Sequence, residues 1–234
     1  MRKAGRQEVV VDVPPPAPLT FSCFPAFLIL AFFICVHLRP SAAILRAADV
    51  TETDLAAVRA IEQQRIQTVN KVYGAVVAVY GKTRQGGGSG VIYDPAGYAL
   101  TNYHVVRSTG NEGLAGLADG VLYPFKVIGI DPGGDVAIIK LSPPKDHPKD
   151  EPFEFPYARL GDDDTVRVGD FVMAMGNPFV LSDDYTPTVT LGVVSGVKRY
   201  QPGQGGTNVL EYGDCIQIDS SINPGNSGGP LFNM

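Results

Sequence analysis

The stretch Pro224-Gly225-Asn226-Ser227-Gly228-Gly229-Pro230 places a serine among closely spaced glycines near the end of the sequence. Residues without a Cβ leave the approach to the Ser227 hydroxyl open and permit a tight turn. Such a turn can present the amide N–H groups of Gly225 and Ser227 to one point. Two converging amides beside a hydroxyl suit acyl transfer, because they stabilise the oxyanion of the tetrahedral intermediate. Taken alone, the stretch also fits a glycine-rich hairpin turn, so the interpretation depends on whether a base is available.

A serine nucleophile needs a base, and the chain has three histidines. His37 lies in an apolar amino-terminal segment, and His147 lies in a charged, proline-rich loop. His104 lies inside the expected folded body, where a β-rich stretch gives way to a turn. This elimination favours His104 as the general base, and with it the catalytic interpretation of Ser227.

Asp135 is the candidate partner of that histidine. It follows two glycines and opens the apolar run Val136–Leu141, so its carboxylate is expected to point toward the interior. A buried carboxylate is costly unless it has a partner, and an imidazole N–H can be that partner. The pairing would hold His104 in the tautomer that can deprotonate Ser227. Asp131, which precedes a proline at the turn, is expected to be solvated.

The body of the chain consists of short β-rich segments separated by turn residues. We expect strands at Ala75–Tyr80, Gly90–Tyr93, Tyr98–Thr101, Val121–Ile130, Val136–Leu141, Phe171–Met175, Thr188–Ser195 and Cys215–Ile218. Such spacing, with 27 glycines and 19 prolines, is typical of antiparallel barrels or sandwiches. The charged, proline-dense stretch Ser142–Pro156 is expected to link two halves.

A single helix is predicted from Thr51 to about Val72. Thr51 as N-cap, with Asp54 three residues later, approximates a capping box. Apolar residues then recur at mostly helical spacing, which is enough for a helix that packs on the domain or on a neighbouring subunit. No other helix is predicted.

The amino terminus has the layout of a targeting segment. Residues 2–6 carry three basic side chains, and Ala26–Val36 is an unbroken apolar run of eleven. That length suits a signal-peptide core and is short of the roughly 20 residues that span a bilayer. Ser41-Ala42-Ala43 resembles a cleavage site. The competing interpretation extends the run to 21–38 and retains it as a membrane anchor; either way we expect export to the periplasm or cell envelope.

Composition excludes several classes of protein. A hydrophobic content of 44% with 18% charged residues is that of a globular chain, not a disordered one. Three cysteines rule out a disulfide framework, and Cys215, which heads an apolar alternation, is expected to be a buried thiol. Residues 1–46 carry a net charge of +3 and the remainder −8. An acidic body argues against nucleic acid as a partner.

Two kinds of ligand site are also not expected. The run Gly86–Gly90 invites a phosphate-loop interpretation, but no Gly-Lys-Ser/Thr follows it and no helix pattern begins there. No cluster of histidine, cysteine and carboxylate residues has the spacing of metal ligands. The sequence therefore implies neither a metal nor another cofactor.

Five motifs stand in order along the chain. They are Gly90-Val91-Ile92-Tyr93, Leu100-Thr101-Asn102-Tyr103-His104-Val105-Val106, Gly134-Asp135-Val136-Ala137, Gly176-Asn177-Pro178-Phe179 and Ile222-Asn223-Pro224-Gly225-Asn226-Ser227-Gly228-Gly229-Pro230-Leu231. Together they resemble the HtrA/Deg family of trypsin-like serine proteases, over roughly Val69 to Met234. The resemblance implies His104 as general base, Asp135 as its orienting partner and Ser227 as nucleophile. It implies an oxyanion hole at Gly225, Asn226 and Ser227.

The resemblance also implies an all-β fold of two antiparallel six-stranded β-barrels with an N-terminal helix. The expected divisions are 1–43 as signal peptide or anchor, 44–72 as helical lead-in and 73–234 as protease domain. Its first barrel would cover about 73–145 and its second about 158–234. The sequence stops seven residues after Ser227. The second barrel is therefore expected to be incomplete, and residues 44–234 made alone are expected to be poorly soluble and inactive.

Two positions bear on activation and specificity. Digestive trypsin-like enzymes have an Asp immediately before the nucleophile, which pairs with a new amino terminus; Asn226 stands here, so that activation route is not expected. Enzymes of trypsin specificity have an Asp six residues before the serine, whereas this chain has Ser221, followed by Ile222. An unpaired Lys or Arg there would cost several kcal/mol. The expected substrate pocket at Ser221 and Ile222 should accept small or medium aliphatic residues.

The function implied by the resemblance is a serine endopeptidase acting on unfolded or damaged envelope proteins, as a homotrimer. The alternative from a different class is a catalytically inactive, protein-binding or chaperone-like remnant of such a protease. An esterase built on Gly-x-Ser-x-Gly is excluded, because the βα alternation and the Ser–Asp–His order of that fold are absent.

Overall fold

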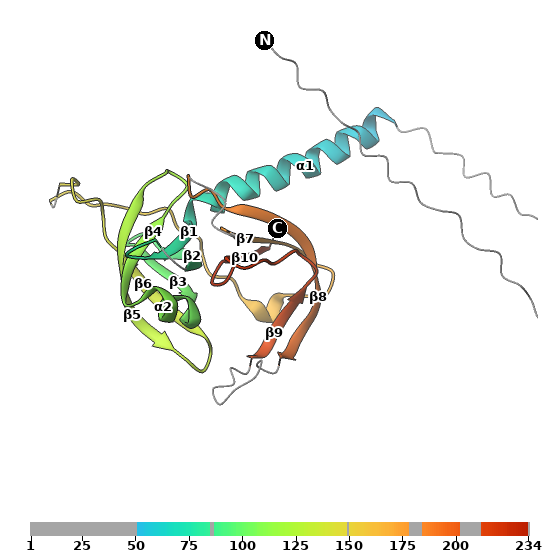
Figure 1. Cartoon of the computed structure of the whole chain (residues 1–234). Coiled ribbons are helices and arrows are strands. Elements are labelled where there is room, and N and C mark those ends of the chain that lie inside the picture. Colours follow the sequence, from blue (N-terminus) through green and yellow to red (C-terminus); the bar gives the residue numbers. More distant parts are fainter. Residues whose placement is uncertain (1–50, 85–86, 149, 178–183, 202–211, 234) are drawn as a thin grey trace, which may run out of the picture. The chain divides into compact units, whose positions relative to one another are not determined.

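A computed structural model describes residues 51–84, 87–148, 150–177, 184–201 and 212–233. All of them belong to one structural unit, Asp49–Met234 (Figure 1). The predicted targeting segment, with Cys23, Cys35 and His37, lies outside the described residues. Among the residues that are described, none of the helices has the length and apolar character needed to cross a membrane.

The expected N-terminal helix is α1, Glu52–Val72, and its capping box is confirmed. The Asp54 N–H donates to Thr51 Oγ1 at 3.2 Å, and the Thr51 N–H donates to Asp54 Oδ2 at 2.9 Å. The bond from the Thr51 N–H, followed by a 2.7 Å bond from Thr51 Oγ1 to the same carboxylate oxygen, lowers the pKa of the Asp54 carboxyl. No residue of α1 is buried, and Val69 and Val72 near its end pack against a small buried cluster. Local capping therefore defines where this helix begins.

Six strands form a closed antiparallel barrel with the order β1-β2-β3-β6-β5-β4, drawn mainly in green in Figure 1. The strands are β1 Val76–Gly81, β2 Gly87–Asp94, β3 Tyr98–Asn102, β4 Glu112–Gly116, β5 Leu122–Asp131 and β6 Val136–Leu141. Five of them match expected strands to within a few residues. β4 was not predicted, because Glu112–Gly116 has two glycines and no run of β-branched residues. Closure pairs β4 with both β1 and β5, so the fold supplies the context that the local sequence lacks.

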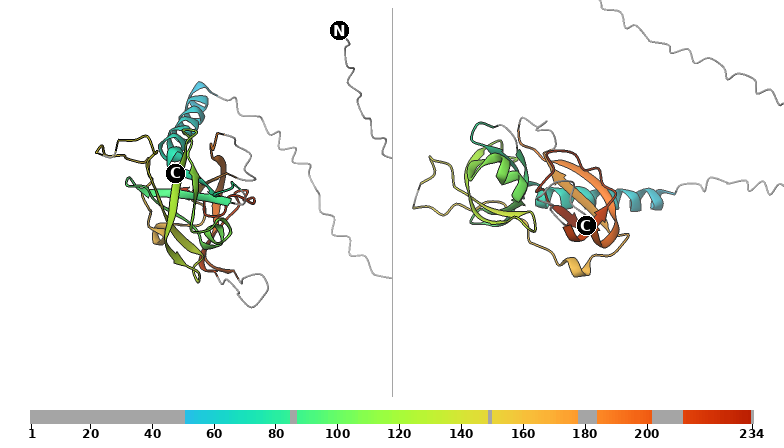
Figure 2. Two further views of the ribbon diagram at one scale, coloured as in Figure 1. Left: turned by 60° about the vertical axis from the view of Figure 1, so that its left-hand side comes forward. Right: turned by 60° about the horizontal axis from the view of Figure 1, so that its bottom comes forward.

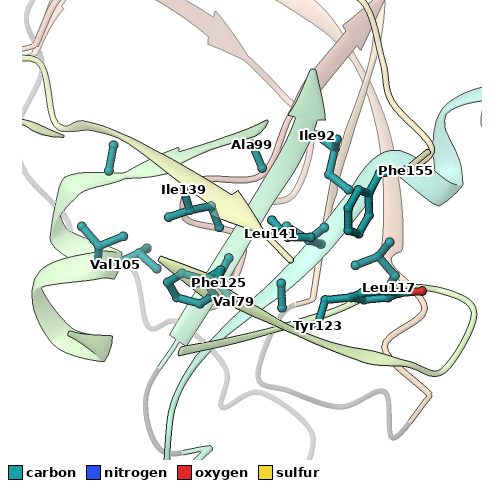
Figure 3. Close-up of a cluster of buried hydrophobic side chains, with 14 residues drawn as sticks. Val79, Ile92, Ala99, Val105, Leu117, Tyr123, Phe125, Ile139, Leu141 and Phe155 are labelled. Atoms are coloured by element: carbon teal, nitrogen blue, oxygen red, sulfur yellow. The ribbon is translucent and has the colours of Figure 1, made fainter. Parts of the chain in front are cut away.

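The barrel interior is filled by alternate residues of its strands, as period-2 burial requires. Along β6, Ala137, Ile139 and Leu141 are buried, and Figure 3 shows the last two beside Phe125. Phe155, from the segment between β6 and β7, packs into the same cluster. The stretch predicted as a charged link therefore also contributes to the first core.

A second, open sheet has the order β10-β7-β8-β9. Its strands are β7 Phe171–Gly176, β8 Thr188–Gln201, β9 Tyr212–Ile218 and β10 Leu231–Asn233, and Figure 2 shows β8 curving as in a half-barrel. Short 3-10 helices occur at Tyr73–Ala75 and Asp163–Thr165. The predicted all-β class is thus confirmed as a closed six-stranded barrel, a half-barrel and an N-terminal helix. Three-residue β10 is too short to have a sequence signal of its own.

One expectation needs correction, and it concerns the segment that carries the candidate base. A turn was expected after β3, but Tyr103–Thr109 form a short helix, α2. Val105 and Val106 are buried against the barrel, which compensates for the low helix propensity of β-branched residues. The helix ends at Gly110, whose φ of +92° favours a residue without a Cβ. Tertiary packing, rather than local helix propensity, therefore determines that Tyr103–Thr109 form a helix.

Candidate active site

His104 and Asp135 form a hydrogen-bonded pair at the mouth of the first barrel. The imidazole Nδ1 lies 2.7 Å from Asp135 Oδ2, and the backbone N–H of His104 donates to Oδ1 at 2.9 Å. The Asp135 side chain is 2% exposed, whereas that of His104 is 38% exposed. One carboxylate therefore holds both the ring and the main chain of the histidine. This arrangement leaves Nε2 as the nitrogen that can exchange a proton with a substrate or a nucleophile.

The position of Asp135 follows from local backbone geometry. It adopts φ +53°, a left-handed conformation that Asp tolerates better than most residues. Its carbonyl accepts from Asn102 Nδ2 at 2.8 Å and from the Tyr103 N–H at 3.1 Å. These two hydrogen bonds join the start of β6 to the junction between β3 and α2. Asp131 remains exposed, as expected, with its Oδ1 accepting from the Gly133 N–H at 3.0 Å.

Tyr212 provides a third donor to the same carboxylate. Its hydroxyl donates to Asp135 Oδ2 at 3.1 Å from β9, which belongs to the other sheet. The pKa of Tyr212 is raised, chiefly by burial and also by the negative charge of Asp135 and this hydrogen bond. The phenol therefore keeps its proton and remains a donor at neutral pH. Nothing in the sequence pointed to Tyr212, because contact between residues 77 positions apart has no local signal.

Ser227, in the loop between β9 and β10, lies against the same junction. Its carbonyl accepts from the Ser89 N–H of β2 at 2.7 Å. A Cβ on the adjacent Gly228 would lie only 2.3 Å from Thr101 Oγ1 and 2.9 Å from the backbone nitrogen of Asn102. The serine-bearing turn thus packs directly on the residues that precede His104. Within the described residues no hydrogen bond joins the Ser227 hydroxyl to His104; in free enzymes such bonds are often long and shorten only with substrate bound.

The turn leaves two of its three candidate amides available. Gly225 adopts φ +103°, and the Asn226 N–H donates to Asn223 O at 3.0 Å, closing a turn. No acceptor for the N–H groups of Gly225 and Ser227 is found in the described part of the chain. The Asn226 amide is therefore committed to the turn. The two flanking amides are left free to bind an oxyanion.

Four other residues singled out in the sequence make no hydrogen bond to His104, Asp135 or Ser227 in the described part of the chain. Ser221 and Ile222 are exposed, Ile222 at 57%, and the Ser221 carbonyl accepts from Thr190 Oγ1 at 3.1 Å. His147 packs its ring on Phe153 and makes a 3.1 Å contact from Nε2 to a backbone carbonyl. Cys215 is half-buried rather than fully buried.

Comparisons with known proteins identify a family model and named relatives that match this chain. A family model described as "Trypsin-like peptidase domain" matches residues 88–234. The chain is 42% identical over 147 residues to the "Probable periplasmic serine endoprotease DegP-like" of Chlamydia pneumoniae, covering 63% of this chain and 26% of that protein. It is 43% identical over 148 residues to the "Periplasmic serine endoprotease DegP" of Salmonella typhimurium, covering 63% and 27%. The chain thus spans about a quarter of the length of these curated relatives.

The fold of this chain also matches the folds of solved structures. "Crystal structure of Deg5" matches with a TM-score of 0.60 and 30% identity, covering 74% of this chain and 80% of that one. "HtrA-type protease AlgW with tripeptide" matches with a TM-score of 0.58 and 36% identity, covering 72% and 50%. Because the family model covers more than half of the chain and its relatives are DegP, Deg and HtrA proteins, the chain belongs to the trypsin-like peptidase family, in its HtrA/Deg branch.

Proposed function

We propose that this chain is the peptidase part of a serine endopeptidase, with His104 as general base, Asp135 as its orienting partner and Ser227 as nucleophile. The observation that carries the proposal is the buried carboxylate that holds His104 through both Nδ1 and the backbone N–H. A buried carboxylate paired in this way is the orienting part of a Ser-His-Asp triad. The serine-bearing turn, packed on the same β3–α2 junction, adds the nucleophile and two free amides.

The proposed reaction follows from this geometry. Ser227 Oγ attacks the scissile carbonyl carbon while its proton moves to His104 Nε2. Asp135 stabilises the resulting imidazolium without itself taking the proton. The carbonyl oxygen becomes an oxyanion that accepts from the N–H groups of Gly225 and Ser227. When the intermediate collapses, the C–N bond breaks and His104 returns the proton to the leaving amine. Water then hydrolyses the acyl-enzyme by the same two steps.

The substrates we propose are unfolded or damaged polypeptides outside the cytoplasm. The names of the DegP relatives, which include "periplasmic serine endoprotease", support export and protein substrates. With Ser221 and Ile222 in place of a buried carboxylate, we expect cleavage after small or medium aliphatic residues. We further propose assembly as a homotrimer, with residues 1–43 acting in export as a signal peptide or as an anchor through 21–38; these proposals rest on the family resemblance and the sequence.

The test uses protein that carries the closing strands of the second barrel. It combines covalent labelling with a fluorophosphonate and cleavage of an unfolded protein, mapped by mass spectrometry. Labelling and cleavage should both be lost in Ser227→Ala and should fall by several orders of magnitude in His104→Ala. His147→Ala is the matched control, because that imidazole lies outside the site, and it should behave as wild type. Wild-type protein that neither labels nor cleaves, while folded, would favour the inactive protein-binding alternative.

A further inference from the structure

Ser89, in β2, is fully buried and makes four hydrogen bonds where the barrel meets the serine-bearing turn. Its N–H donates to the Ser227 carbonyl at 2.7 Å, and its Oγ donates to the Gly225 carbonyl at 2.7 Å. The same Oγ accepts from the Asn177 N–H at 2.9 Å, and the Ser89 carbonyl accepts from Thr101 Oγ1 at 2.7 Å. Every polar atom of Ser89 is thus used, and two of the four bonds reach the turn.

The two bonds to the turn reach the two residues with free amides. Gly225 and Ser227 each have their own carbonyl held by Ser89, one by its side chain and the other by its main chain. Only φ and ψ separate the N–H of a residue from its carbonyl, so anchoring the carbonyl restricts the direction of the N–H. The restriction matters most at Gly225, which adopts φ +103° and has wide conformational freedom without an anchor.

The direction of the hydroxyl proton is determined by the surroundings. A backbone N–H can only donate, so the bond from Asn177 makes Ser89 Oγ an acceptor on that side. Its own proton is then directed to the Gly225 carbonyl. Asn177 is itself held, because its Nδ2 donates to the Tyr80 hydroxyl at 2.9 Å. A Cβ on Gly176 would lie 2.9 Å from Ser89 Oγ, so the hydroxyl is closely enclosed.

From this geometry we propose that Ser89 is a positioning residue whose hydroxyl holds the Gly225–Ser227 turn in the conformation that binds the oxyanion. The inference rests on the proposed peptidase function and adds a residue to it. Without the hydroxyl, the Gly225 carbonyl and the Asn177 N–H would both lose their partner in a buried place. The turn would then shift toward other partners, and the two amides would no longer converge. Since the oxyanion exists only along the reaction path, kcat should fall while KM stays the same.

The experiment compares Ser89→Ala with Tyr123→Phe in protein that also carries the closing strands of the second barrel. Tyr123→Phe is the matched control: it removes the hydroxyl of another buried residue, on β5, which donates to Asp119 Oδ2 at 2.7 Å and makes no hydrogen bond to Ser89 or to the turn. We expect Ser89→Ala to lower kcat and the fluorophosphonate labelling rate about 10- to 100-fold, as a shift of the turn by up to ~1 Å would. Tyr123→Phe should stay within about threefold of wild type, and urea unfolding checks that both variants are folded. The acid limb of the pH–rate profile should not move, because the His104–Asp135 pair is untouched.

The outcomes separate this inference from the proposed function. Wild-type protein that does not label would refute the peptidase function itself. Labelling of Ser89→Ala at the wild-type rate, or an equal loss in both variants, would refute the positioning role alone. If Ser89→Ala does not fold, Ser89→Cys provides the test, since its thiol is a weaker donor. Folded Ser89→Cys should then show an intermediate loss of kcat with KM unchanged, and wild-type kcat would overturn the inference.

Discussion

Gly228→Ala should inactivate the site by displacing the serine-bearing turn. Gly228 adopts φ +81°, and a Cβ built on it would lie 2.3 Å from Ser89 O, 2.3 Å from Thr101 Oγ1 and 2.9 Å from Asn102 N. Ordinary van der Waals contact begins at about 3.4 Å, so the closest atoms must separate by about 1 Å. Two of these atoms are backbone in the closed barrel. The turn that carries Ser227 is therefore the part that moves.

The magnitude follows from this displacement. Misplacement of a reacting group by ~1 Å costs roughly 100-fold in rate, so kcat/KM should fall about that much. An alanine at this positive φ also strains the backbone, by roughly 1–2 kcal/mol. Gly120→Ala separates the two effects, since Gly120 has φ +79° and no atom lies within 4 Å of its built Cβ. The control should carry the same strain with unchanged activity.

The assay measures fluorophosphonate labelling rate and kcat/KM on an unfolded protein, with urea unfolding of each variant. Gly228→Ala should lose at least as much stability as Gly120→Ala, and only Gly228→Ala should lose activity. If Gly228→Ala, folded, labels at the wild-type rate, the close contact between the turn and the barrel is wrong. Equal loss of activity in Gly120→Ala would instead attribute the effect to backbone strain alone.

Two further predictions concern stability. Phe125→Ala should lower the free energy of unfolding by about 3–5 kcal/mol in urea titration, because this ring is 2% exposed in the barrel core; Phe171→Ala, at 64% exposure, should change it by less than ~0.5 kcal/mol. The raised pKa of Tyr212 means that the folded state holds its phenolic proton more tightly than the unfolded chain does. That contribution is complete below about pH 10 and is lost as pH rises through the higher folded value. Wild type should therefore lose stability relative to Tyr212→Phe only above about pH 10, and a difference that does not change with pH would contradict the bond to Asp135.

The element types were largely predictable because most of them depend on local patterns. The capping box at Thr51 places the start of α1, and alternation of apolar residues marks strands such as β6, whatever the rest of the chain does. Where the local pattern is weak, prediction failed. β4 contains two glycines, and α2 is formed by β-branched residues that would favour a strand, so only their packing in the closed barrel decides their conformation.

The candidate site likewise has features that the sequence predicts and features that only the tertiary structure determines. The sequence alone determined which residue types were available: three histidines of which one lies in the folded body, a serine among glycines, and an acid that opens an apolar strand. Tertiary structure decided how they are held. The contacts of Tyr212 with Asp135 and of Ser89 with Gly225 join residues 77 and 136 positions apart. Such contacts arise when two sheets pack, and hydrogen bonds between groups so distant in sequence leave no pattern in either local stretch.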